Sequence, residues 1–87
     1  MTDHTKLGEA LSDILFEHAI EAQKSGDKDL RDSYCFWTQI VNTPTLTRDH
    51  IYSYIKGLER RAIKENHKNS QIIARVFHDF LTERSEL

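Results

Sequence analysis

Five histidines and fourteen acidic side chains supply the residue types that bind metal ions. The spacing that comes closest to a metal site is Glu17, His18 and Glu21, because a histidine and a glutamate three residues apart on a helix can reach the same ion. The sequence contains no second copy of this spacing, and no two histidines lie four residues apart. We therefore predict no metal site, and we interpret the histidines as solvated or helix-capping residues.

Cys35, the single cysteine, is the other candidate for chemistry. A cysteine becomes a nucleophile when a nearby base favours its thiolate, and His50 or His78 would have to supply that base. The sequence around Cys35 contains no nucleophile elbow and no glycine-rich turn. We interpret Cys35 as a small residue in a helix rich in aromatic side chains.

A calcium loop and a phosphate loop are the remaining patterns to test. Asp27 and Asp29 begin like the loop of an EF-hand, but its third ligand position is Arg31 and its twelfth is Thr38, where glutamate is required. No glycine-rich loop that could bind phosphate is present. We predict that the protein is not an enzyme and that it needs no cofactor.

The strongest charge pattern is a ladder of basic residues four positions apart. It consists of Lys56, Arg60, Lys64 and Lys68, with Arg61 beside it. Like charges at this spacing on a helix cost about 0.2 to 0.5 kcal/mol per pair. A ladder of bases can bind phosphate groups, and Tyr52 and Tyr54 could stack on bases of a nucleic acid. Nucleic-acid binding through this basic ladder is our alternative prediction.

The link Thr43-Pro44-Thr45 gives this alternative a loose structural basis. Two helices joined by a short link resemble a helix-turn-helix. The leading end of its reading helix would carry Arg48, Asp49, Tyr52 and Ser53. However, the turn lacks the usual glycine, and the chain has a net charge of -2. The helix-turn-helix therefore ranks second to an interaction with protein.

A second ladder has the opposite sign. It consists of Glu9, Asp13, Glu17 and Glu21. Each ladder lies opposite the apolar stripe of its own helix, so the two ladders cannot face each other within one compact monomer. Between molecules they can meet. An apolar centre would come from residues off the core stripes, namely Phe16, Ile20, Phe36, Tyr54 and Ile72. We predict a small regulatory, inhibitory or adaptor protein that binds a protein partner and self-associates.

The helix that carries the basic ladder has the clearest start signal. Thr47 can accept hydrogen bonds from the first backbone N–H groups of a helix. Leu46 and Ile51, on either side of this cap, fit a hydrophobic staple. Apolar residues then follow on one face at Ile51, Ile55, Leu58 and Ala62. The pattern predicts a helix from residue 46 to residue 63, extending to 66, with one face in a core.

Apolar periodicity predicts further helices before and after this one. The first runs from Lys6 to the Ser25-Gly26 stop, after a frayed segment 1–5. The second begins after a cap at Asp27 and runs to about Asn42. A fourth would follow a break at 66–70, with Asn69 or Ser70 as its cap. Sustained alternation typical of a strand is missing from the sequence.

The break at 66–70 has a rival interpretation. If the helix continued through 66–70 without a break, the apolar residues of 72–81 would lie on nearly the same face as those of 51–62. A single helix over 47–84 would be about 57 Å long at 1.5 Å per residue and would need other chains to cover it. We predict an all-α fold, a three- or four-helix bundle in one domain spanning 1–87, with this long helix as the alternative.

Composition agrees with a globular chain. Hydrophobic residues make up 38% and charged residues 30% of the sequence. Residues 1–46 carry eight acids and four bases, whereas 47–87 carry six acids and eight bases. One cysteine indicates a reducing compartment, and no apolar run reaches the length of a membrane span. With no secretion signal at the start of the sequence, we expect a cytoplasmic location and no membrane contact.

Overall fold

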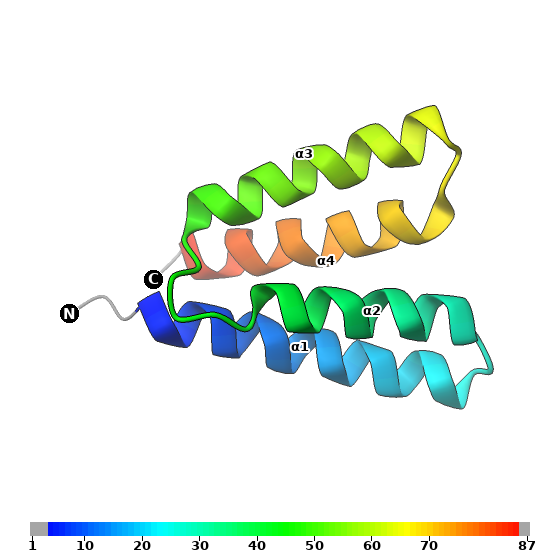
Figure 1. Ribbon diagram of the computed structural model, residues 1–87, viewed down its shortest axis with the longest axis horizontal. Helices are drawn as coiled ribbons and strands as arrows, with labels where there is room; N and C mark the ends of the chain where they lie inside the picture. The colour runs from blue at the N-terminus through cyan, green and yellow to red at the C-terminus, as the bar shows by residue number, and fades with distance from the viewer. Residues whose placement is uncertain (1–3, 86–87) are drawn as a thin grey trace. The chain divides into compact units, whose positions relative to one another are not determined.

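The fold is all-α, as predicted. The computed structural model describes residues 4–85 (Figure 1). These residues form four helices, which are α1 (His4–Lys24), α2 (Lys28–Val41), α3 (Arg48–Lys64) and α4 (Lys68–Ser85). They contain no strand. The chain divides into two compact units, residues 1–47 and 48–87, and each is a pair of helices packed side by side. The single domain over 1–87 stays a prediction.

The first unit is the hairpin α1–α2. Its buried apolar side chains recur at helical spacing, at Leu11, Leu15, Ala19 and Ala22 on α1 and at Tyr34 and Val41 on α2. Helix α1 begins at His4, two residues before the predicted start at Lys6. The predicted frayed segment 1–5 therefore loses its last two residues to the helix, and residues 1–3 lie outside the described part of the chain.

Gly8 sets how closely α1 approaches the chain that follows α2. A Cβ atom at this position would lie 2.6 Å from the carbonyl oxygens of Val41 and Thr43. Such a distance is far below van der Waals contact, and both oxygens belong to the backbone, which cannot move aside easily. Only glycine therefore permits this approach within the first unit.

The turn between α1 and α2 ends one helix and begins the next. Gly26 has a φ of +83°, in the left-handed region that favours glycine. The Gly26 N–H donates to the Gln23 carbonyl at 3.1 Å, and the Asp27 N–H donates to the Ala22 carbonyl at 2.9 Å. These two bonds form a Schellman motif. The Asp27 carboxylate then accepts a hydrogen bond from the Leu30 N–H at 3.1 Å, which confirms the predicted cap.

The turn between α3 and α4 is built in the same way. Asn66 has a φ of +52°, and the His67 N–H donates to the Ala62 carbonyl at 3.2 Å. His67 Nδ1 accepts a hydrogen bond from the Ser70 N–H at 3.1 Å and lies 2.7 Å from Ser70 Oγ. His67 is therefore both the end of one capping motif and the N-cap of the next helix.

This turn corrects two predictions. The single helix over 47–84 is wrong, because a left-handed residue at Asn66 reverses the chain direction and ends α3. The predicted caps Asn69 and Ser70 are also wrong, since both lie inside α4. The cap is His67, in line with the interpretation of the histidines as solvated or capping residues.

The second unit is the hairpin α3–α4. Buried apolar residues on α3 are Ile51, Ile55 and Leu58, and those on α4 are Ile73, Ala74, Phe77, Phe80 and Leu81. Arg48 donates from its guanidinium to the Leu81 carbonyl at 3.2 Å, which ties the start of α3 to the end of α4. Ala62, the last residue of the predicted apolar stripe on α3, is half-buried, whereas the other three are buried. No described helix combines the length and the apolar character that a membrane span requires.

Candidate protein-binding surface

Phe16 and Ile20 lie on the exposed side of α1. Each directly follows a core residue, because Leu15 and Ala19 are buried with 0% and 3% of their surface exposed. One residue further along a helix turns the side chain by about 100° away from the core direction. Phe16 and Ile20 accordingly retain 54% and 41% exposure. They are one turn apart, so they form an adjacent apolar pair.

A groove of about 300 Å³ lies beside this pair. The residues that line it come from both helices of the first hairpin: Phe16, Ala19, Ile20, Gln23, Lys24, Arg31 and Cys35. Cys35 is a free, half-buried thiol, as expected of a small residue packed within a helix. The surface is therefore apolar in its centre and carries polar and basic side chains at one end. We call it the α1–α2 surface.

Arg31 forms the polar end of the α1–α2 surface. Its Nη1 donates to Gln23 Oε1 at 3.1 Å, which links α2 to α1. Its Nε and Nη2 donate to Asp32 Oδ1 at 3.0 and 2.8 Å. The guanidinium is thereby held in place beside the groove. Sequence reasoning missed Arg31 and Gln23, because neither stands out until the two helices are paired.

Phe36 is exposed but lies apart from this groove. It retains 59% exposure and is absent from the groove lining. Its ring packs edge-on against Trp37, with centroids 5.7 Å apart and an interplanar angle of 84°. Phe36 is thus a separate apolar position on α2. The prediction that it joins Phe16 and Ile20 in one partner-binding site finds no support in the groove.

Tyr54 and Ile72, the other predicted apolar positions, belong to the second hairpin. Both are half-buried. The large apolar residues exposed on α3 are instead Tyr52 at 49% and Ile63 at 85%. Ile63 was missed because it is the last residue of the predicted helix. It directly follows Ala62, so it lies one position off the core stripe, and this offset could have identified it as exposed.

The acidic ladder is exposed along α1. Glu9, Asp13, Glu17 and Glu21 all face solvent. Glu21 forms an ion pair with Lys24, with 3.9 Å between the carboxylate oxygen and Nζ. Both side chains are more than 70% exposed, so this pair adds little to stability. The acids border the Phe16–Ile20 pair along one side of the helix.

The basic ladder is shorter than predicted. Lys56, Arg60 and Lys64 are exposed at intervals of four on α3. Lys68 begins α4, after the left-handed residue Asn66, so it does not continue the ladder. Arg61 is engaged by Glu65, with 3.3 Å between Nε and the carboxylate oxygen. Three bases of the predicted five therefore share one exposed face of α3.

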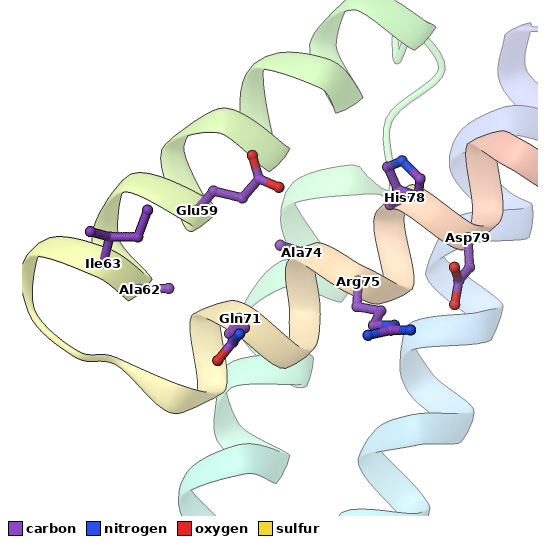
Figure 2. Close-up of a pocket in the computed structure, with 8 residues that line it drawn as sticks. All are labelled: Glu59, Ala62, Ile63, Gln71, Ala74, Arg75, His78 and Asp79. Atoms are coloured by element: carbon purple, nitrogen blue, oxygen red, sulfur yellow. The ribbon is translucent and has the colours of Figure 1, made fainter.

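The second hairpin has a groove of its own, of about 710 Å³ (Figure 2). Its lining consists of Glu59, Ala62, Ile63, Gln71, Ala74, Arg75, His78 and Asp79. Figure 2 shows the small side chains of Ala62 on α3 and Ala74 on α4 pointing into the space between the two helices. The small size of these two residues leaves the groove open. We call it the α3–α4 groove.

His18 on α1 and Tyr34 on α2 form an aromatic contact between the two helices of the first hairpin. His18 stacks on Tyr34, with ring centroids 5.3 Å apart and an interplanar angle of 18°. Burial raises the pKa of the Tyr34 hydroxyl above its usual value. Within the residues the structure describes, no three His, Cys, Asp or Glu side chains gather where they could hold a metal ion.

Comparisons of the chain with protein-family models, curated proteins and solved structures gave no match. Two surfaces of the molecule are candidates for its function. One is an apolar pair beside a groove on α1–α2, bordered by acids. The other is an open groove on α3–α4, next to a face with three bases.

Proposed function

We propose that this protein is a small regulatory or inhibitory module that acts by binding another protein through the α1–α2 surface, and that it self-associates. The observation that carries the proposal is the exposure of Phe16 and Ile20, at 54% and 41%, beside a groove. Scattered apolar residues are normal on a surface, but an adjacent pair next to a concavity is typical of an interaction site.

The energetics support this role. Fully burying an exposed Phe or Ile side chain is worth about 1.5 to 3 kcal/mol, so covering the exposed parts of Phe16 and Ile20 would contribute about 1 to 3 kcal/mol. An aromatic anchor surrounded by polar side chains is the usual composition of a binding hot spot. The Arg31 guanidinium, already held by Gln23 and Asp32, would enter the contact without much loss of conformational freedom.

The test is quantitative capture of partners from the native host, with wild type and Phe16→Ser/Ile20→Ser as baits. We expect the captured protein to disappear with the double variant, because the apolar centre is removed while the fold is kept. Gln39→Ser, at an exposed position on α2, is the matched control and should capture as wild type does. Equal capture by the double variant would overturn the proposal.

Nucleic-acid binding is the second candidate, supported by the three exposed bases on α3. Three phosphate contacts would give a log–log salt slope of about -2.7. A gel-shift assay at low salt with Arg60→Glu/Lys64→Glu separates the two candidates. We expect no shift with wild type. A shift that this double variant abolishes would favour nucleic acid as the partner.

A further inference from the structure

We propose that the α1–α2 surface of one molecule docks on α3 and α4 of a second copy of this chain. The acidic ladder of α1 would pair with the basic face of α3, and the Phe16–Ile20 pair would enter the α3–α4 groove. This inference rests on the proposed function, since it names the partner of the same surface.

Charge and pitch are complementary. Asp13, Glu17 and Glu21 are exposed on α1 at intervals of four. Lys56, Arg60 and Lys64 are exposed on α3 at the same interval. Four residues advance a helix by about 6 Å, so two antiparallel or parallel helices can place these charges opposite one another in register. Each ladder carries like-charge repulsion within its own helix, and such a contact would relieve it.

The apolar parts are complementary as well. Phe16 and Ile20 project from α1, whereas Ala62 and Ala74 leave space between α3 and α4 (Figure 2). The groove of about 710 Å³ is open to solvent, so side chains of another molecule can enter it. Ile63, at 85% exposure, lines the same groove and would be covered by the incoming side chains.

The basic face and the groove belong to one continuous surface. Arg60 precedes Ile63 by three residues, and Lys56 precedes Glu59 by three, so each base neighbours a groove residue on the same side of α3. The groove lining also contains two acidic residues, Glu59 and Asp79, and one basic residue, Arg75. The attraction for the acids of α1 therefore comes from the ladder of α3, and the groove supplies the apolar contact.

A charge exchange tests this pairing by sedimentation velocity. Asp13→Lys/Glu17→Lys and Lys56→Glu/Arg60→Glu should each weaken self-association by about tenfold or more, because like charges then face each other. An equimolar mixture of the two variants should associate again, since the reversed α1 face meets the reversed α3 face. Asp29→Lys, an exposed acid on α2 outside the ladder, should behave as wild type.

The outcomes separate this inference from the proposed function. Association of wild type that neither reversal weakens, or a mixture that stays monomeric, would overturn the pairing while self-association stands. A monomeric wild type would overturn both the pairing and self-association, and partner capture with Phe16→Ser/Ile20→Ser would still test binding to another protein. Circular dichroism verifies that each variant folds, and the single changes Glu17→Lys and Arg60→Glu replace any double variant that does not.

Discussion

Tyr34 is a buried titratable residue of the first hairpin. It is 3% exposed, it stacks on His18, and burial raises its pKa. The ionised phenolate is therefore disfavoured in the folded protein relative to the unfolded chain.

We predict that Tyr34 makes the protein sensitive to alkaline pH. A raised pKa in the folded state means that stability is fully present below the unfolded pKa of about 10 and is lost as the pH rises through the folded pKa. Urea unfolding at pH values from about 8 to 11 should show a steeper loss for wild type than for Tyr34→Phe. Parallel pH profiles for the two proteins would contradict this prediction.

His67 gives a second prediction at this scale. Replacing it with alanine removes the acceptor for the Ser70 N–H and should lower the free energy of unfolding by about 1 kcal/mol. His67→Asn keeps an N-cap acceptor and serves as the matched control, with stability close to wild type. Chemical denaturation of the three proteins measures the difference. Equal losses in both variants would show that the ring packs rather than caps.

At the scale of the helices, the two hairpins share one type of turn. In each, a left-handed residue ends the first helix and the next residue caps the second, at Gly26-Asp27 and at Asn66-His67. The sequence predicted the first turn, because glycine commonly ends a helix and aspartate commonly caps the start of the next one. It predicted the second turn poorly, because asparagine and histidine favour helix ends less strongly than glycine and aspartate do. In addition, the apolar residues on either side of this turn would lie on one face of a continuous helix.

Two glycines test this account of the turns. Gly26→Ala should cost about 1 to 2 kcal/mol, because alanine is strained at a φ of +83°. Gly57→Ala, inside α3, should stabilise the protein by about 0.5 to 1 kcal/mol. A Cβ at either position meets nothing within 4 Å, so the backbone alone decides the sign. Thermal unfolding of both variants measures the two effects. Equal shifts of the unfolding midpoint in Gly26→Ala and Gly57→Ala would contradict the role assigned to Gly26 in the turn.

At the scale of the whole molecule, the sequence predicted more of the first hairpin's surface than of the second's. Phe16 and Ile20 were identified because they lie off the core stripe of a long, regular helix, and both are exposed. Tyr54 was assigned to the same set but is half-buried. The groove beside Ala62 was not foreseen, because a concavity depends on which small residues face each other across two helices.

The central claim is that Phe16 and Ile20 form the surface through which copies of this chain associate. The measurement that tests it most directly is sedimentation velocity of wild type and Phe16→Ser/Ile20→Ser over a wide range of concentrations, with circular dichroism as the check on folding. We predict that wild type forms larger species as its concentration rises, while the folded double variant remains monomeric. Identical sedimentation of the two proteins at every concentration would contradict the account.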